Sequence, residues 1–457
     1  MRKPARPRLA ALAAALVAAL AAVVACTPGE SRPGEPSTSS TADPTGATGE
    51  PVTLRFAVYG DEALVASYTE LAEAFTRSNP RITVDVLAAR DATAAQRDLQ
   101  STEADGLPPD VFLSASDQLP RLVSEARVQP VDTLLEDRGI EFGDGYQREG
   151  LEAFSADSAL QCMPHDVSPL VVYYNERLLD PSQLVDDVTD PGPTARSGWS
   201  FDQFSLAARR IARGGTANGV HIEPDLEMLA PFIWSGGGDL VDDLEEPTSL
   251  ALSGDDTRAV LEALLTLFRD QGVTPTRAQL SRKDAVQRFA RGRLGMILGT
   301  RGVTPQLRAA RGLDFEAFPL PNLGSYRTVS SITGYCISST TSHVEEAADL
   351  VAFAAGREGA SITSRSGYVV PANVTVVTSP AFTQPTRQPR NAFLFSETVR
   401  RADETPRVAG WPKVVRETRP LLEQMYYAPV VNLDVLLPQI DLRSQTILAP
   451  EEPPETE

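Results

Sequence analysis

The chain has 457 residues, of which 42% are hydrophobic and 23% are charged, and its formal net charge is −19 at pH 7. This acidic balance argues against nucleic acid and anionic lipid surfaces as partners. About 400 residues follow the N-terminal segments described next, which is too many for one hydrophobic core, so we expect two domains.

The first 25 residues have the pattern of an export signal. Four basic residues lie within the first eight, and the run 9–24 is entirely apolar. Sixteen apolar residues are too few to span a bilayer, so a cleaved signal peptide over 1–25 is predicted. The sequence Val23-Val24-Ala25-Cys26 resembles a lipobox, which implies a lipid on Cys26; the alternative is a chance cysteine near an ordinary cleavage site.

A flexible linker is predicted over residues 26–51. Of the 24 residues from 27 to 50, 17 are Thr, Ser, Pro or Gly, and such a segment cannot bury enough apolar surface to fold. With lipid on Cys26, the linker would tether the folded body to the outer face of the membrane. The charged, Pro-rich tail 450–457 is predicted to be disordered.

Two further cysteines, Cys162 and Cys336, remain in a compartment that favours oxidation. We expect a disulfide, while two buried free thiols or a Cys/His metal site are the alternatives. His165, His221 and His343 are scattered without metal-ligand spacing, so we expect neither a metal site nor a cofactor.

The N-terminal part of the body alternates strand and helix patterns. Residues 52–59 alternate in polarity, residues 64–75 carry apolar side chains at helical spacing, and 82–86 alternate again. A helix over 92–103 and a short buried strand over 110–113 follow. This β-α-β-α-β order predicts a parallel sheet with helices on both faces.

Ligands in such sheets bind at the carboxyl ends of the strands. The two strand ends here are Tyr59-Gly60-Asp61 and Ser114-Ala115-Ser116-Asp117. Because Gly, Asp and Ser also populate ordinary turns, a binding role and a turn role are both open at this point.

Six segments together resemble an extracellular solute-binding protein of the sugar-binding kind, the receptor of an ATP-driven (ABC) importer. The first, Pro164-His165-Asp166 through Tyr173-Tyr174-Asn175, resembles a hinge crossing, and Gly198-Trp199-Ser200 resembles a capped helix start. The others are the glycine-rich turn 234–242, the strand and loop 289–300, the return strand 332–338 with a helix over 343–355, and a third hinge strand 366–373.

The resemblance implies a two-lobed α/β fold of the periplasmic-binding-protein type, with a mostly parallel sheet in each lobe and hinge strands between them. Lobe 1 would comprise 52–161 and 336–371, and lobe 2 would comprise 162–335 and 372–449. It implies a monomer that holds a small molecule, a mono- or oligosaccharide, in the interlobe cleft and delivers it to membrane permease subunits. It also makes Cys162 and Cys336 neighbours on adjacent hinge strands, which supports the disulfide.

A sugar needs hydrogen-bonding partners for its hydroxyl groups and aromatic rings for its C–H faces. The polar candidates are Asp61, Asp117, Asp166 and Asp239, and the ring candidates are Tyr59, Tyr174, Trp234 and Trp411, for which core packing is the alternative. The resemblance and the strand ends add Gly60, Ser116, His165, Gly236, Gly237, Gly299, Thr300, Thr333 and Gly334.

Catalysis has little support in the sequence. It lacks a Gly-x-Ser-x-Gly elbow, a His-Glu-x-x-His motif and a glycine-rich phosphate loop, so we expect no enzyme and no catalytic residue. A glycoside hydrolase, which needs only two suitably placed carboxylates, is the main rival. Binding of a peptide, a polyamine or another small solute by the same fold is the other alternative.

Overall fold

The computed structural model describes residues 50–104, 106–184, 193–270 and 272–449. The predicted signal peptide, Cys26, the linker up to residue 49 and the tail from residue 450 therefore lie outside the described residues. Within the described ranges, no helix combines the length and the apolar character needed to cross a membrane.

The larger of the two main sheets is built from both ends of the described chain. Its strands lie in the order β13-β12-β3-β1-β2, and β4 and β7 also pair with β12. Their bounds are β1 (Val52–Tyr59), β2 (Ile82–Ala89), β3 (Val111–Ala115), β4 (Val128–Gln129), β7 (Cys162–Pro169), β12 (Thr328–Ser338) and β13 (Ala402–Asp403).

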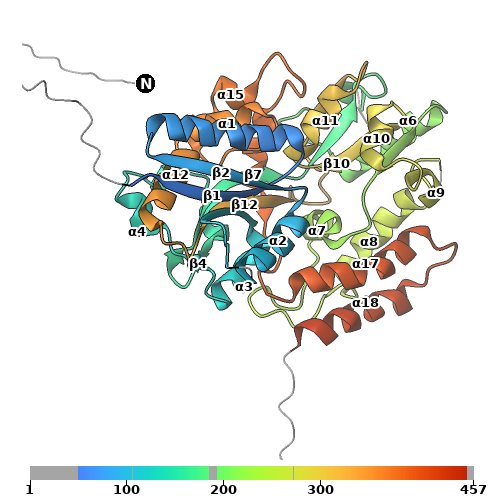
Figure 1. Cartoon of the computed structure of the whole chain (residues 1–457). Coiled ribbons are helices and arrows are strands. Elements are labelled where there is room, and N and C mark those ends of the chain that lie inside the picture. Colours follow the sequence, from blue (N-terminus) through green and yellow to red (C-terminus); the bar gives the residue numbers. More distant parts are fainter. Residues whose placement is uncertain (1–49, 105, 185–192, 271, 450–457) are drawn as a thin grey trace, which may run out of the picture. The chain divides into compact units, whose positions relative to one another are not determined.

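The predicted N-terminal unit is confirmed. β1 pairs in parallel with both β2 and β3, and alternate residues of β1 are buried because one face of the strand packs on a core. Helices α1 (Glu62–Ser78), α12 (Val344–Ala355) and α3 (Leu119–Ser124) all contribute buried residues to the core cluster of this sheet. α2 (Ala92–Ala104) and α3 lie across the sheet from α1 (Figure 1).

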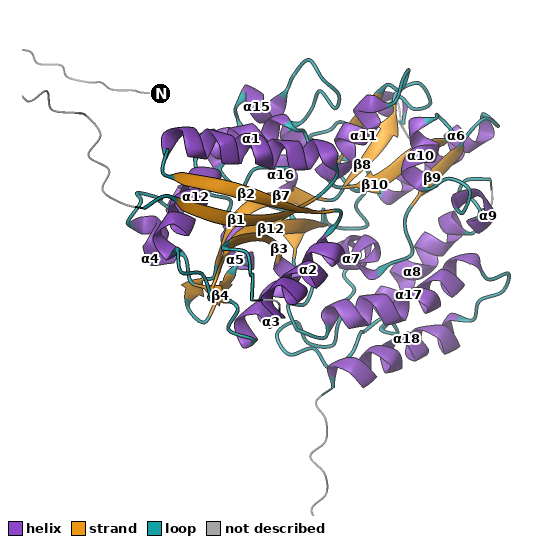
Figure 2. Cartoon of the chain, in the orientation of Figure 1, coloured by secondary structure: helices purple, strands orange, loops and turns teal. Residues whose placement is uncertain are grey.

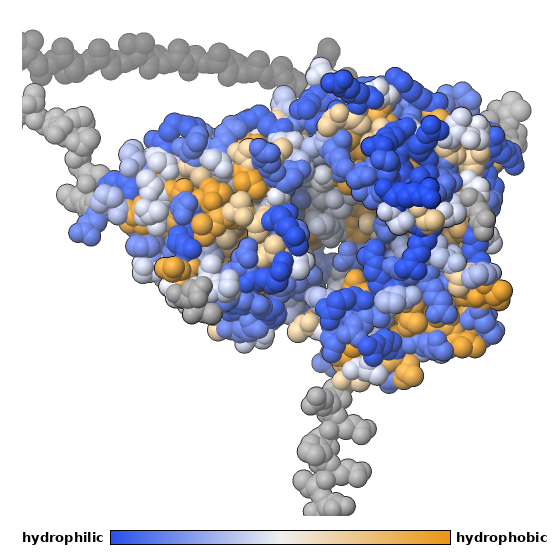
Figure 3. Space-filling view, turned by 45° about the vertical axis from the view of Figure 1, so that its right-hand side comes forward, coloured by the Kyte–Doolittle hydropathy of each residue, from blue (hydrophilic) through white to orange (hydrophobic). Residues whose placement is uncertain are grey.

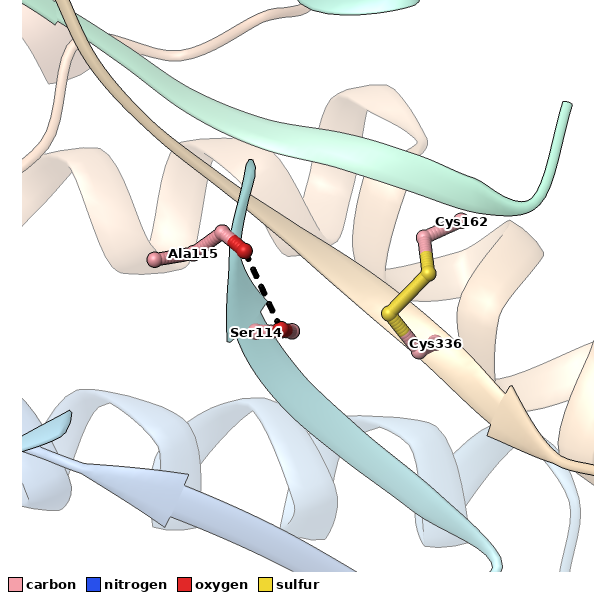
Figure 4. Close-up of a disulfide and its surroundings, with 4 residues drawn as sticks. All are labelled: Ser114, Ala115, Cys162 and Cys336. Carbon is pink, nitrogen blue, oxygen red and sulfur yellow. Dashed lines mark hydrogen bonds between the residues drawn. A yellow bond between two sulfur atoms is a disulfide. The ribbon is translucent and has the colours of Figure 1, made fainter. Parts of the chain in front are cut away.

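β7 and β12 form the long antiparallel pair of this sheet. Cys162 and Cys336 lie directly opposite each other in its register and are joined by a disulfide, with their Cα atoms 4.4 Å apart (Figure 4). The predicted disulfide is therefore confirmed. The register shifts between Thr333 and Gly334, so the pair contains a bulge.

The smaller sheet has the strand order β11-β8-β10-β9, in which only β9 and β10 pair in parallel. The prediction of a mostly parallel sheet is therefore wrong for this sheet. Its strands are β8 (Val171–Asn175), β9 (Asn218–His221), β10 (Leu294–Gly299) and β11 (Phe315–Phe318). Successive residues of β8 point into different cores: Val172 and Tyr174 into one, Val171 and Tyr173 into the other. Both faces of the sheet are therefore covered, as Figure 2 shows for its helices.

Two groups of helices cover the smaller sheet. One core includes residues of α6 (Phe201–Arg213), α7 (Leu226–Ser235), α8 (Asp255–Phe268), α17 (Trp411–Tyr427) and α18 (Leu433–Leu448). The other includes residues of α10 (Ala285–Ala290), α11 (Thr304–Ala309), α14 (Val374–Val377), α15 (Pro380–Thr383) and α16 (Phe393–Val399). The predicted capped start at Ser200 is confirmed, since Ser200 and Gln203 form a capping box at α6.

Shorter elements complete the described chain. The helices are α4 (Asp132–Glu136), α5 (Arg148–Ala153), α9 (Arg277–Leu280) and α13 (Arg357–Arg365), and β5 (Ser155–Ala156) pairs with β6 (Ala159–Leu160). Single turns of 3-10 helix are η1 (Ser116–Gln118), η2 (Gly143–Gly145), η3 (Pro181–Gln183) and η4 (Arg301–Val303).

The hinge region differs in detail from the expectation. β7 lies in the larger sheet, and the chain enters the smaller sheet only at β8, after Pro169 and Leu170. The predicted third hinge strand is reduced to isolated bridges, such as that from Pro371 to Asp166. The lobe boundaries themselves stay a prediction.

Candidate functional site

Parallel strands of both sheets end near the candidate site. In the larger sheet β1 ends at Tyr59 and β3 leads into η1 with Ser116 and Asp117. In the smaller sheet the parallel pair β9 and β10 ends at His221 and Gly299. The carboxyl edge of a parallel sheet is where α/β proteins bind ligands, so these strand ends are candidate positions for a binding site.

A cavity of about 410 Å³ lies beside the ends of β1 and β3. Its walls come from β1, β3, α2 and α3, and residues Pro412 and Arg416 of α17 line it from the helices of the smaller sheet. Figure 3 shows the surface hollowed in the middle of the molecule, between the part with the larger sheet and the part with α17 and α18.

Asp117 is the carboxylate of this cavity. Gln96 donates to the side-chain oxygen of Gln118 at 2.7 Å, and Gln118 donates to Oδ2 of Asp117 at 3.2 Å. Oδ1 of Asp117 is buried and has no donor among the described residues. Burial raises the pKa of Asp117 above its ordinary value. The free oxygen can accept a hydrogen bond from a ligand hydroxyl or amine.

Tyr59 shares the cavity with Asp117. Ala57 and Tyr59 point to the same side of β1 and both line the cavity. Burial raises the pKa of the Tyr59 hydroxyl, and the negative charges of Asp166 and Asp117 raise it further. The hydroxyl therefore stays protonated and can donate a hydrogen bond.

Asp166 lies on β7, next to these groups. Its Oδ1 accepts from the backbone N–H of Val370 at 2.6 Å and from Ser168 Oγ at 2.7 Å. Burial raises the pKa of Asp166 to about 7, against the lowering effect of these hydrogen bonds. Thr333 of β12 is the register partner of both Asp166 and Ala115, so it lies between the end of β3 and the middle of β7.

Sequence analysis missed the acidic segment after β9. Glu223, Asp225 and Glu227 follow this strand, and Asp225 caps α7 by accepting from the N–H of Met228 at 2.9 Å. Glu227 is exposed, yet desolvation by the surrounding protein and the charges of Asp225 and Asp117 raise its pKa. The charge of Asp117, in η1 after β3, therefore acts on Glu227 in α7, a helix that packs in a core of the smaller sheet. The detectable signal was a short strand followed by three carboxylates.

The glycine-rich turn after α7 is shaped by packing. A Cβ on Gly236 would come within 2.2 Å of Val260, and one on Gly238 within 2.5 Å of Thr257, so the turn needs glycine to approach α8. Gly237 has φ +86°, a conformation that favours glycine. Trp234 is half-buried against the core, and Asp239 is exposed. These residues lie at the opposite end of α7 from Glu227.

Gly60 and Asp61 serve the start of α1. Asp61 Oδ1 accepts from the N–H of Leu64 at 3.0 Å, and its Oδ2 accepts a hydrogen bond from the hydroxyl of Tyr368. Gly60 has φ +145°, and a Cβ there would come 2.7 Å from Leu64. The sequence did not single out Tyr368, because its partner lies 307 residues away.

His165 is buried inside the larger sheet and faces no opening. Its Nε2 lies 3.0 Å from the hydroxyl of Tyr68 and its Nδ1 3.0 Å from that of Tyr335. Burial lowers the pKa of His165 to about 3, so the ring is neutral at pH 7 and one nitrogen donates while the other accepts. Both nitrogens are used by the protein itself.

The remaining predicted residues lie in packing positions. Trp411 is 2% exposed in the core beneath α17, and Tyr174 packs edge-on against Phe318. A Cβ on Gly334 would come 2.8 Å from Phe154, and the carbonyl of Thr300 accepts from Tyr173 at 3.0 Å. Gly299 is buried against Val303 and Tyr173. The structure thus groups Tyr59, Asp117, Asp166 and Thr333, with Ser116 beside Asp117.

The sequence and the fold were compared with those of known proteins. A family model described as bacterial extracellular solute-binding protein matches residues 70–389. No curated protein matches the chain.

Solved structures resemble the chain over 87% of its length. The ABC substrate-binding protein Lmo0181 from Listeria monocytogenes, in complex with cycloalternan, has 18% identity and a TM-score of 0.75 over 99% of its own chain. The GacH receptor of Streptomyces glaucescens, also studied with acarbose, has 16% identity and a TM-score of 0.73 over 98% of its chain. The sugar-binding protein MalE from Xanthomonas citri has 19% identity and a TM-score of 0.73 over 97% of its chain.

Proposed function

Because the chain belongs to the bacterial extracellular solute-binding proteins, we propose that it is the receptor of an ABC importer and that its solute is a carbohydrate. The ligands named for the structural relatives, cycloalternan and acarbose among them, support this solute class. The receptor would hold the sugar between the two sheets and present it to permease subunits. Binding would favour a closed arrangement through contacts that the open one lacks.

The observation that carries the proposal is the unpaired Oδ1 of Asp117 in the cavity. A buried acceptor without a donor is costly, so a ligand that donates a hydrogen bond there gains affinity. Tyr59 adds a donor and a ring, and Asp166 lies close enough for its charge to act on the Tyr59 hydroxyl. Sugar hydroxyl groups donate and accept, which suits this mixed set of groups.

The N-terminus supports a membrane-anchored receptor. With lipid on Cys26 and a linker over 26–51, the folded body would remain on the outer face of the membrane. The Cys26→Ser substitution should release the exported protein from the membrane fraction. A variant that stays in that fraction would contradict the lipid anchor.

The first experiment is a thermal-shift screen of the mature protein with mono- and oligosaccharides, including maltotriose and acarbose. A bound sugar at about 100 times its Kd should stabilise the native state by roughly 2.7 kcal/mol. Recovering the sugar chemically unchanged would support a receptor, whereas cleavage products would support the glycoside hydrolase instead. Amino acids, peptides and polyamines serve as controls.

Asp117→Asn tests the site itself. The amide keeps the shape but cannot offer a charged acceptor, so we expect the Kd of the sugar to rise roughly 10- to 100-fold. Asp91→Asn is the matched control, because Asp91 follows the neighbouring strand β2 and its Oδ1 is already used by the N–H of Ala94. Equal effects of the two variants on the Kd would remove Asp117 from the site.

A solute that carries an amine is the second candidate. Asp117, Asp166 and Glu227 all have raised pKa values, and a cation near them would lower the cost of their ionisation. Spermidine or an amino sugar that shifts the melting temperature, with no effect of neutral sugars, would favour this candidate over the first.

A further inference from the structure

Two arginines beside the smaller sheet form an unusual pair. Arg301 lies in η4 and Arg308 in α11, seven residues later in the same helical run, which places both on one face. Arg301 is 0% exposed, and Arg308 is half-buried. Charged side chains are almost never fully buried unless they are paired, so both arginines are expected to have acceptors or anions as partners.

The hydrogen bonds of Arg301 are incomplete. Its Nη2 donates to the backbone oxygen of Phe382 at 2.9 Å. The guanidinium carbon lies 4.4 Å from the ring centre of Phe382 and 5.2 Å from that of Phe395, so two rings partly stabilise the cation. Nε and Nη1 are buried without an acceptor among the described residues. The rings do not replace hydrogen-bond acceptors for these two nitrogens.

Arg308 has the same deficiency. Its Nε donates to the backbone oxygen of Gln388 at 2.5 Å and its Nη1 to Oε1 of Gln384 at 2.6 Å. Its Nη2 is buried without an acceptor in the part of the chain that the structure describes. Gly367 makes room for this guanidinium, since a Cβ there would come 2.7 Å from Nη1.

No carboxylate neutralises the pair within the described ranges: every nitrogen of the two guanidinium groups either donates to a carbonyl oxygen or lacks an acceptor. Asp166 attracts Arg301 from a distance, but its Oδ1 is used by Val370 and Ser168. Burial lowers the pKa of both arginines to about 10, and the charge of Arg301 lowers that of Arg308 further.

We propose that Arg301 and Arg308 together bind a single-atom anion, chloride in physiological media. Three buried nitrogens without acceptors, on two like-charged side chains, provide both the N–H donors and the positive charge that such an ion requires. A phosphate or carboxylate would bring additional oxygen atoms that need further donors. A single-atom anion needs only those that are present.

The anion would act on stability, apart from the solute cavity. Arg301 holds the carbonyl of Phe382 in α15, and Arg308 holds the segment after it through Gln384 and Gln388. Neutralising the repulsion between the two cations would fix α15 and this segment against the smaller sheet. The proposal does not depend on which solute the protein binds.

Bromide is the probe for a direct test. Crystals grown with sodium bromide should show an anomalous peak within hydrogen-bond reach of nitrogens from both arginines. In solution, the Tm in sodium chloride or bromide should exceed that in sodium gluconate at equal ionic strength by roughly 2 °C or more. Absence of the peak, with ordered water on these N–H groups, would overturn the proposal.

Variants separate this site from general salt effects. Arg308→Gln removes one cation, so its Tm should no longer distinguish chloride from gluconate. Arg148→Gln is the matched control, because Arg148 is exposed and pairs with Glu152 on the same helix, and it should keep the wild-type difference. A chloride effect that persists in Arg308→Gln would contradict the site, and the bromide map of the wild type decides the question if that variant fails to fold.

Discussion

Two groups of buried polar side chains on the larger sheet differ in how they are satisfied. Tyr68, His165 and Tyr335 come from three different elements and satisfy the histidine ring completely, 3.0 Å on either side. Asp117, at the end of β3, leaves one oxygen without a donor in a cavity. Both groups contain residue types that sequence analysis links to ligand binding.

The difference shows that hydrogen-bond satisfaction separates a structural polar group from one available to a ligand. A buried group with both partners inside the protein stabilises one conformation and offers nothing further. A buried group with a missing partner raises the free energy of the unliganded state and can recover it on binding. Changes in the first group should therefore affect stability, and changes in the second should affect binding.

The disulfide adjoining the satisfied group should have the largest effect. Cys162 and Cys336 are 174 residues apart in sequence, so their bond strongly restricts the unfolded chain. A Cys162→Ser and Cys336→Ser double variant should lose about 4–5 kcal/mol of the free energy of unfolding, measured in guanidinium chloride. Wild-type protein with its disulfide reduced is the control and should lose a similar amount. An unchanged denaturation midpoint in both the double variant and the reduced wild type would show that the disulfide does not stabilise the fold.

His165→Ala should come next. It removes two hydrogen bonds, leaves the hydroxyls of Tyr68 and Tyr335 buried without the ring, and creates a cavity, so we expect a loss of about 3–4 kcal/mol in the free energy of unfolding. The Kd for the solute should change less than threefold. His343→Ala is the control, because His343 makes no side-chain cap bond at α12 and should cost little. A large loss of affinity in folded His165→Ala would break the distinction between the two groups.

The pH dependence of stability should reveal Asp166 with a smaller effect. Its pKa of about 7 in the folded protein exceeds the usual value of about 3.9 in an unfolded chain, so the folded state keeps its proton longer. The cost of ionising Asp166 in the folded protein is absent below pH 4 and complete above pH 7. The free energy of unfolding therefore falls as the pH rises between these values. Relative to the wild type, Asp166→Asn should therefore gain roughly 1–3 kcal/mol between pH 4 and pH 8.

The free energies of unfolding of Asp166→Asn and the wild type are compared at each pH, because His165 also makes stability depend on pH. The lowered pKa of His165 gives the opposite slope over part of the same range, because its unfolded form takes up a proton first as the pH falls. This contribution is common to both proteins and cancels in the difference. If the difference in free energy of unfolding between the variant and the wild type stays constant from pH 4 to pH 8, the pKa of Asp166 is not raised in the folded protein.

Much of the fold was readable from local patterns. The alternation in 52–59, the helical spacing in 64–75 and the breakers between them predicted β1, α1 and the parallel order, because one-sided burial leaves a periodic record in the sequence. The strand ends at Tyr59 and Asp117 do line the cavity, and their role in ligand binding stays a prediction. The acidic segment from Glu223 to Glu227 was overlooked, since its strand has only four residues.

The role of each candidate side chain was decided by contacts between distant parts of the chain. His165 and Trp411 are residue types suited to ligand binding. His165 instead forms hydrogen bonds with Tyr68 and Tyr335, and Trp411 packs in the core beneath α17. Sequence by itself indicated the N-terminal β-α-β-α-β order and favoured a disulfide between Cys162 and Cys336, because the first depends on local periodicity and the second on a count of two cysteines. Only the tertiary structure decided which polar groups are satisfied, because a hydrogen-bond partner 97 or 170 residues away leaves no local trace.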